Sequence, residues 1–315
     1  MQCRWRRRDG FEVRPSFGFV RTSSPVDGAL RDVERLWAPK WEGTDMGLDQ
    51  VRLNAIIDGE HSFYGSQRTE VRVDRRFNPG TRDFLATQVQ PNMRVLDVGC
   101  GSGGTLLRLS SRIASGLGVD NDPEHIRMAD EALRESGAKN VEFRQLDFLE
   151  DGGDLEPESF DLAFTERGPI GFGGHGMRLA LRALKPNGLL FCEMIGNLHH
   201  QEAAALFGTG QPRYRMTRSL DEARVAMERN GVDIRLAAEI VQKRCYPDVY
   251  EWLRFQCSIW AWLGVPLPTP DDPRLALFAE RNTIDSGEIE TTHHVVWVAG
   301  VKADHTSGSE IFHHT

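Results

Sequence analysis

Apolar residues follow two alternating patterns along this chain, and together they predict an α/β fold. Short apolar runs that suit buried strands occur at about 93–98, 140–146 and 160–165. Between them lie longer stretches with apolar residues three and four positions apart, which is typical of amphipathic helices. Strands that alternate with helices in this way predict a mainly parallel sheet with helices on both faces.

The two ends of the chain differ from this alternating middle. Residues 1–28 and 304–315 show no period and are predicted to be flexible, which leaves 29–303 as one domain. Within that domain, 29–90 has helical spacing without strand patterns and is predicted to be a helical cap. Its last helix is predicted over 81–89.

A second addition lies between the last two predicted strands, which cover 232–241 and 294–301. The insertion spans 246–290. Its first part, 247–263, is rich in aromatic and aliphatic residues on most sides of a helix, so this helix must be buried. Two placements remain open: the helix covers the ligand pocket, or it forms the interface of a homodimer.

The composition and charge of the chain argue against several classes of protein. The chain has 315 residues and a net charge of −8, and its pI of about 5.7 argues against broad nucleic-acid binding. Its five cysteines form no C-x-x-C pair, so we expect no metal site and a reducing, cytoplasmic compartment. No apolar run reaches the roughly 18 residues that a membrane-spanning helix needs. The basic N-terminus lacks the apolar segment of a secretory signal.

The stretch 95–104 carries the strongest chemical signal. A short buried strand has Asp97 near its end, and Gly99, Gly101 and Gly103 follow before a helical run. Strand, glycine turn and helix form the opening unit of nucleotide-binding α/β domains. Glycine permits positive φ and lets a ligand lie against bare backbone.

Two ligands compete for this turn. The spacing of Gly99, Gly101 and Gly104 satisfies the dinucleotide pattern G-x-G-x-x-G, which favours NAD. Asp97 argues against NAD, because a carboxylate about 4 Å from a pyrophosphate costs roughly 1–4 kcal/mol. S-adenosylmethionine (SAM) has no phosphate and carries an ammonium group that an acid favours. We therefore predict that SAM binds and that NAD does not.

The same stretch resembles the first motif of the class I SAM-dependent methyltransferases, [DE]-x-G-x-G-x-G, position for position. The resemblance covers roughly 80–245 and 292–303. It implies a seven-stranded, mostly parallel sheet of order 3-2-1-4-5-7-6 with strand seven antiparallel. Helices cover both faces, and the two helical additions serve as lid elements. A narrower likeness, to bacterial methyltransferases with unassigned acceptors, rests on 166–169, 207–211 and the aromatic helix.

The resemblance also implies a set of cofactor contacts. Asp120 at the second strand end would accept both ribose hydroxyls, and Asp147 at the third would accept from the adenine amino group. Phe148 would pack on the adenine ring. Each acid alone also fits a helix N-cap. The implied set is Asp97, Gly99, Gly101, Gly103, Asp120, Asn121, Asp147, Phe148 and Thr165.

The acceptor site is expected beside the glycine-rich loop that follows the fourth strand, near the reacting methyl group. Glu166 and His199 are the candidates for proton removal. Tyr64, Arg167 and Trp252 are the candidates for acceptor contact. The aromatic side chains of the lid elements favour an apolar or aromatic acceptor over a sugar or a phosphate.

The predicted function is therefore methyl transfer from SAM to an O, N or C atom of a small molecule. An RNA methyltransferase is the main alternative, because Arg167, Arg178 and Arg182 are available for phosphate contacts. An NAD(P)-linked oxidoreductase and a SAM-binding protein without turnover are the others.

Overall fold

The structure is a computed structural model that describes residues 47–61, 72–73, 80–172, 174–208 and 217–303. The chain divides into two compact units, Met1–Asp49 and Gln50–Thr315, and every helix and strand described lies in the second. The predicted flexible ends and most of the predicted helical cap lie outside the described residues. No helix in the described part is long and apolar enough to cross a membrane.

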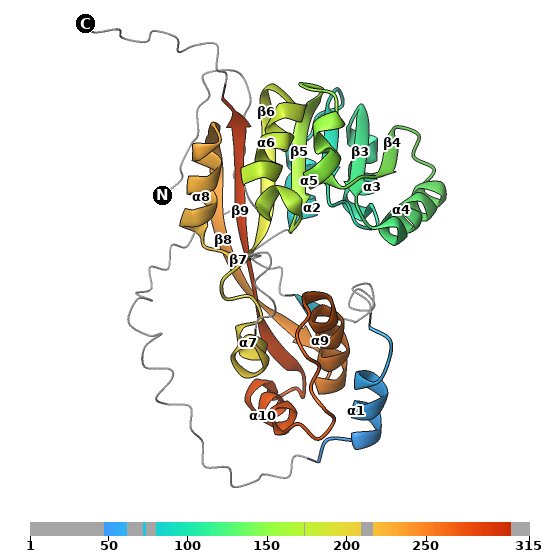
Figure 1. The fold of residues 1–315 in the computed structure, drawn as a ribbon, viewed down its shortest axis with the longest axis vertical. Coiled ribbons are helices and arrows are strands. Elements are labelled where there is room, and N and C mark those ends of the chain that lie inside the picture. The colour runs from blue at the N-terminus through green and yellow to red at the C-terminus, as the bar shows by residue number, and fades with distance from the viewer. Residues whose placement is uncertain (1–46, 62–71, 74–79, 173, 209–216, 304–315) are drawn as a thin grey trace, which may run out of the picture. The chain divides into compact units, whose positions relative to one another are not determined.

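One mixed sheet organises the second unit (Figure 1). Its order is β1-β8-β9-β6-β5-β2-β3-β4, with β7 paired to β6, and β9 runs antiparallel to both β6 and β8. The predicted order 3-2-1-4-5-7-6, with strand seven antiparallel, is confirmed for the seven main strands. The strands are β1 Arg72–Val73, β2 Arg94–Val98, β3 Ser115–Asp120, β4 Val141–Gln145, β5 Phe160–Glu166, β6 Leu184–Gly196, β7 Thr217–Arg218, β8 Val232–Tyr246 and β9 Ile289–Lys302.

The helices begin and end largely where the sequence predicts. Asp122 accepts from the backbone N–H of Glu124 with Pro123 in the first turn, and Gly137 closes that helix at positive φ. The sequence Ser219-Leu-Asp-Glu222 predicts a capping box at the start of another helix, and the structure has it. The helices are α1 Gln50–Ile57, α2 Thr81–Gln88, α3 Gly104–Leu109, α4 Pro123–Ser136, α5 Phe148–Asp151, α6 Gly174–Ala183, α7 Gln201–Phe207, α8 Leu220–Arg229, α9 Val249–Leu263 and α10 Pro273–Asn282.

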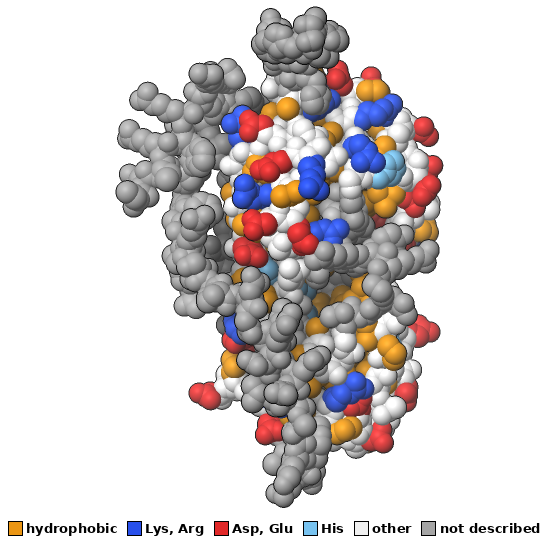
Figure 2. Space-filling view, turned by 60° about the vertical axis from the view of Figure 1, so that its left-hand side comes forward, with side chains coloured by type: hydrophobic (Ala, Val, Ile, Leu, Met, Phe, Trp, Pro, Cys, Tyr) orange, Lys and Arg blue, Asp and Glu red, His pale blue; other side chains and the backbone are white. Residues whose placement is uncertain are grey.

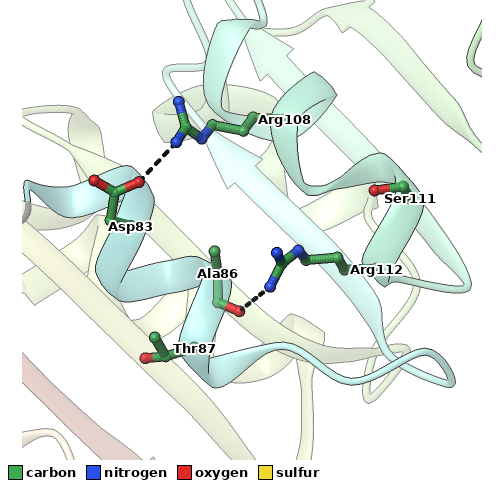
Figure 3. A pocket seen from close by; sticks show the side chains of 6 residues that line it. All are labelled: Asp83, Ala86, Thr87, Arg108, Ser111 and Arg112. Atoms are coloured by element: carbon green, nitrogen blue, oxygen red, sulfur yellow. Dashed lines mark hydrogen bonds and ion pairs between the residues drawn. The ribbon is translucent and has the colours of Figure 1, made fainter.

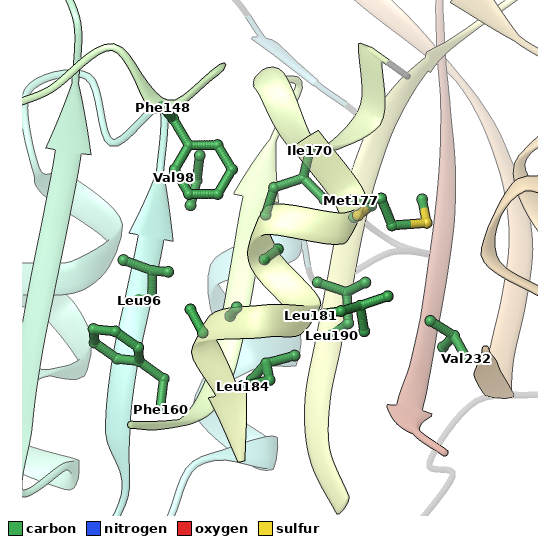
Figure 4. Close-up of a cluster of buried hydrophobic side chains, with 14 of the residues drawn as sticks. Leu96, Val98, Phe148, Phe160, Ile170, Met177, Leu181, Leu184, Leu190 and Val232 are labelled. Atoms are coloured by element: carbon green, nitrogen blue, oxygen red, sulfur yellow. The ribbon is translucent and has the colours of Figure 1, made fainter. Parts of the chain in front are cut away.

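Two hydrophobic cores cover the two faces of the sheet. On one face, side chains of α6 such as Met177 and Leu181 pack over Leu96 and Val98 of β2 (Figure 4). On the other face, α2 and α3 pack over Val95. Because neighbouring residues of a strand point to opposite faces, Asp97 lies on the α2–α3 side. The first acid of the motif is therefore directed toward the face where α3 begins.

β8 and β9 continue well past the end of β6. The last residue pair between β6 and β9 is Ile195 with Val295, whereas β8 and β9 stay paired as far as Tyr246 and Ile289. The sequence predicts strands that stop at 241 and start at 294, because the continuation is polar. Helices α7, α9 and α10 pack on this continuation, and α1 packs on α9 (Figure 1).

The edge of β9 that β6 leaves open is closed by the start of α7. The backbone N–H of His200 donates to the carbonyl of Thr292 at 2.9 Å, and the Glu202 carboxylate accepts from the Thr292 N–H at 3.0 Å. The His199 ring accepts from the backbone N–H of His294 at 3.2 Å. Side chains thus satisfy backbone groups that a further strand would otherwise pair.

Candidate active site

The glycine turn has the backbone geometry that the sequence predicts. Gly99, Gly101 and Gly103 have φ of 75°, 52° and 76°. A side chain at Gly103 would overlap the ring of Phe143, and one at Gly101 would meet no atom within 4 Å. The turn therefore combines a tightly packed position with bare backbone that faces open space, where a ligand can approach closely.

Asp97 is buried at the end of β2, with 3% of its surface exposed. Burial raises the pKa of Asp97 well above its ordinary value, and the negative charges of Glu166 and Asp120 raise it further. The positive charge of Arg82 acts in the opposite direction. A cation beside this carboxylate would relieve its electrostatic cost, whereas a pyrophosphate would increase it. The site therefore fits the ammonium and sulfonium groups of SAM.

Asp120 already has three internal hydrogen-bond donors. Its carboxylate accepts from the backbone N–H groups of Gly101 and Asp122 and from His125, at 2.9–3.0 Å. Burial opposes the charge, but these hydrogen bonds hold the pKa of Asp120 below its ordinary value. A carboxylate offers about four acceptor sites, so roughly one remains for a ribose hydroxyl. Binding both hydroxyls would require one internal donor to move.

The remaining predicted cofactor residues differ in how much surface they offer. Asp147 caps α5 through the N–H of Leu149 at 3.0 Å and is half-buried, while Asn121 is exposed. Phe148 is 3% exposed within the core of Figure 4. Thr165 is fully buried, and its hydroxyl donates to the carbonyl of Val98 at 2.7 Å. The side chains of these last two residues support the site from beneath, and their cofactor contacts stay predictions.

Two glutamates face each other across neighbouring strands at the ligand edge of the sheet. Glu166 of β5 is the register partner of Glu193 of β6. Thr105 donates to Glu166, and Thr81 and Trp297 donate to Glu193, the latter at 2.9 Å. Burial raises the pKa of Glu166, the charge of Glu193 adds to this, and the Thr105 hydrogen bond opposes it.

Glu193 is a site residue for which the sequence leaves two interpretations open, proton transfer or a hydrated loop, and it is not in the predicted set above. The sequence shows a glutamate near the end of the fifth strand but does not give the register that pairs it with Glu166. Arg167 lies next to this pair: its backbone N–H donates to the Glu193 carbonyl at 2.7 Å, and its Nε lies 3.5 Å from the carboxylate. Arg167 adopts φ of 63°, which turns the loop toward β6. The structure thus brings two predicted residues, Glu166 and Arg167, together around Glu193.

The structure places His199 at the base of the β8–β9 continuation. Its Nδ1 accepts from the His294 backbone, so the neutral ring carries its proton on Nε2. Burial lowers the pKa of His199 well below its ordinary value, and the neighbouring histidines and arginines lower it further. Because the lone pair is engaged, Glu166 is better placed than His199 to accept a proton.

Trp252 does not offer a surface to an acceptor. It is fully buried and stacks on Phe278 of α10, with ring centroids 3.6 Å apart. Trp260 is 2% exposed and packs against Phe207 of α7. The aromatic helix α9 therefore forms a core with α7 and α10, and the acceptor contact of Trp252 stays a prediction. Tyr64 lies outside the described residues.

A separate pocket of about 410 Å³ lies between α2 and the turn after α3 (Figure 3). Arg108 pairs with Asp83 across it at 2.8 Å, and Arg112 donates to the carbonyl of Ala86 at 3.3 Å. The glycine turn lies at the opposite, N-terminal end of α3. The pocket therefore belongs to the outer surface and not to the site formed by Asp97, Glu166 and Glu193.

Comparisons with known proteins agree with this geometry. Residues 89–239 match a family described as "Methyltransferase domain". The chain is 27% identical over 176 residues to the ribosomal protein L11 methyltransferase of Caldanaerobacter subterraneus, covering 45% of this chain and 57% of that protein. It is 41% identical over 104 residues to the 23S rRNA (uracil(1939)-C(5))-methyltransferase RlmD of Shewanella sediminis. This match covers 33% of this chain and 22% of that protein. The chain thus spans only part of the length of these curated relatives.

Two solved structures share the fold. YcgJ of Bacillus subtilis has a TM-score of 0.53 at 17% identity, over 71% of this chain and 98% of that one. A Bacillus halodurans C-125 protein has a TM-score of 0.53 at 14% identity, over 71% of this chain and 100% of that one. The family match, the glycine turn and the sheet order lead to one conclusion: the chain carries a class I, Rossmann-like SAM-dependent methyltransferase domain, and SAM is the methyl donor that this family implies.

Proposed function

We propose that this protein transfers a methyl group from SAM to an oxygen, nitrogen or carbon atom of a small organic molecule. The observation that carries the proposal is the Glu166–Glu193 pair, which lies at the ligand edge of the sheet on the same face as Asp97. Three carboxylates there favour a cationic ligand. One of them, Glu166, is also available to an acceptor that loses a proton.

The residues that would hold SAM are Asp97, the glycine turn and Asp120. When bound, SAM supplies an electrophilic methyl group on a sulfonium that is already positively charged. The chain therefore has to align the acceptor and keep water away, and strongly activated catalytic groups are not required.

Glu166 is placed to take the proton of an acceptor O–H or N–H group. Its raised pKa makes its carboxylate a stronger base than an exposed glutamate, which is the direction that general base catalysis needs. Thr105 holds one of its oxygens, which fixes the carboxylate and leaves the second oxygen for the acceptor. Glu193 positions Arg167 through both its backbone carbonyl and its carboxylate.

An RNA acceptor is the second candidate, and one observation favours it: the relative with the highest identity given above is an rRNA methyltransferase by name. The charge of this chain argues against it. Net charge is −8, and on the face shown in Figure 2 acidic and basic side chains of the described residues intermingle without a broad basic surface. RNA binding through phosphates needs such a surface and falls steeply with salt.

Labelled SAM separates the candidates. The full chain is incubated with methyl-labelled SAM and either the small-molecule fraction or the RNA fraction of a cell lysate. We expect label in small molecules, and we expect Glu166→Gln to abolish it. Label in RNA that falls steeply with added salt would establish the second candidate instead. Titration with SAM, NAD and NADP tests which cofactor binds. Micromolar affinity for NAD would overturn the assignment of SAM as the cofactor.

A further inference from the structure

Three histidines and two arginines gather where β8 and β9 leave the sheet. This His–Arg cluster consists of His199, His200, His293, Arg167 and Arg244. The ring of His199 lies 4.3 Å from that of His200 and 4.9 Å from that of His293, measured between centroids. Burial lowers the pKa of each histidine, and Arg244 and Arg167 lower all three further. The two arginines therefore both lie close to neutral imidazoles.

Acidic groups near the cluster are engaged elsewhere. Glu202 accepts from the backbone and hydroxyl of Thr292, and Glu239 pairs with His294 at 3.3 Å. Glu193 pairs with Arg167. Within the part of the chain that the structure describes, no carboxylate pairs with Arg244. Its guanidinium charge is therefore not neutralised by the protein.

Buried polar atoms that lack partners outside their own group lie around Arg244 on one face of the β8–β9 pair. The register places Arg244 opposite Thr291, with Tyr246 and His293 two residues along on the same face. Tyr246 and Thr291 are fully buried. In the described residues, the Tyr246 hydroxyl interacts with the side chains of Arg244 and Thr291, and beyond this group Nε of Arg244, Oγ1 of Thr291 and Nδ1 of His293 are buried without a hydrogen-bond partner. Buried polar groups are normally paired, so this concentration indicates a binding site.

Phe255 of α9 holds the polar groups in place. Its ring centroid lies 5.4 Å from that of Tyr246, 5.7 Å from that of His200 and 5.3 Å from Cζ of Arg244. One aromatic ring therefore packs against an arginine, a tyrosine and a histidine at once. The guanidinium and the two hydroxyls are all able to donate to the same ligand, which must then be an acceptor.

We propose that the methyl acceptor carries an oxyanion, a carboxylate or a phosphate, and that Arg244 binds it together with Tyr246 and Thr291. This rests on the proposed function, because it assigns the cluster to the acceptor. An oxyanion both neutralises the guanidinium and accepts from the hydroxyls, whereas a neutral ligand accepts hydrogen bonds but leaves the charge uncompensated. In the described residues, no group of three or more histidine, cysteine or carboxylate side chains has the arrangement to hold a metal ion.

Three aromatic probes of similar size test the charge requirement. The full chain, saturated with S-adenosylhomocysteine, is titrated by calorimetry with benzoate, phenyl phosphate and the neutral benzamide. We expect one of the two anions to bind about tenfold more tightly than benzamide or better. The stronger of benzoate and phenyl phosphate then identifies the anion as a carboxylate or a phosphate.

Substitutions locate the site. Arg244→Gln should weaken binding of the preferred anion about tenfold or more, and Tyr246→Phe, which keeps the ring, should weaken it severalfold. Arg235→Gln is the matched control, because Arg235 lies on the same strand and is 58% exposed. It should leave anion binding unchanged. Unchanged S-adenosylhomocysteine affinity shows that each variant is folded.

The outcomes separate the two proposals. If S-adenosylhomocysteine binds but the anions bind no better than benzamide, the anion site is overturned and the methyltransferase proposal stands. The same conclusion follows if Arg244→Gln binds the anion like the wild type. If S-adenosylhomocysteine does not bind, the proposed function fails, whereas Arg244-dependent binding of benzoate or phenyl phosphate still establishes the anion site.

Discussion

The glycine-turn acids and the His–Arg cluster are two buried polar regions with opposite charge. In the first, burial raises the pKa of Asp97 and Glu166. In the second, burial lowers the pKa of His199 and His200. Each region holds more charge of one sign than its neighbours compensate. The difference supports the proposal that each region binds a ligand of opposite charge. Arg167 of the cluster also lies 3.5 Å from the Glu193 carboxylate.

The largest effect should come from replacing the proton acceptor. Glu166→Gln keeps the Thr105 contact but removes the basic oxygen, so methyl transfer should fall about a hundredfold or more, while SAM affinity falls only severalfold through the lost charge. The measurement is the single-turnover rate with the acceptor that labelling identifies. Glu124→Gln, on the exposed surface of α4, is the control. A rate within threefold of wild type would remove Glu166 from the acid–base chemistry.

The next effect tests whether the acidic region holds the cofactor. Asp120→Ala removes a charge-assisted hydrogen bond, so SAM affinity should fall roughly ten- to a hundredfold. Calorimetry measures it, and the melting temperature reports whether losing the contact with Gly101 loosens the turn. Unchanged affinity in a folded variant contradicts the role of Asp120.

The cluster of histidines should make folding sensitive to acid. The pKa of His200 is about 3 in the folded protein against about 6.5 unfolded, so the unfolded state binds more protons between these values. The free energy of unfolding should therefore decrease as the pH is lowered from 6.5 toward 3. Each such histidine contributes about 1.4 kcal/mol per pH unit.

His200→Asn tests this dependence, because asparagine tolerates the left-handed backbone at this position, where φ is 50°. The variant should flatten the slope by about 1.4 kcal/mol per pH unit, as measured by denaturant unfolding. His175→Asn removes an exposed histidine and serves as the control. An unaltered slope in His200→Asn would show that this ring is not held neutral by burial.

Asp97→Asn should separate stability from binding. The raised pKa of Asp97 means that its charged form costs stability at neutral pH, a cost that acidification removes, so the amide should raise the melting temperature at pH 7. SAM affinity should fall severalfold, because the cationic cofactor loses its counter-charge. A variant that is more stable and also binds SAM as well as wild type would show that Asp97 is structural only.

The central part of the fold could be predicted from the sequence because its helix-start, helix-end and turn residues agree with one another. Asp122 with Pro123 starts a helix, Gly137 ends it, and Asn187 takes a positive φ in the irregular first part of β6. The glycine turn is confirmed for the same reason: each signal depends on residues close together in sequence. Such signals need no knowledge of tertiary contacts.

The candidate site could be predicted less well where it depends on strand register and on the burial of side chains. Glu193 becomes part of the site only through its pairing with Glu166. Arg244 and His293 fall in polar stretches that predict the end of a strand, although both lie within the long β8–β9 pair. For Trp252, the apolar pattern correctly indicates burial but does not say that Phe278 is its partner. These features require distant segments to be placed together.

The position of β9 has a consequence for how the chain folds. β9 follows β6 and β8 in sequence but lies between them in the sheet. During synthesis, β6 and β8 therefore emerge before the strand that joins them, and each presents an unpaired backbone edge until β9 inserts. Such edges recruit strands from other chains. The ligand edge of the sheet and the base of the His–Arg cluster are thus completed in one late event, which couples assembly of the active site to the end of folding.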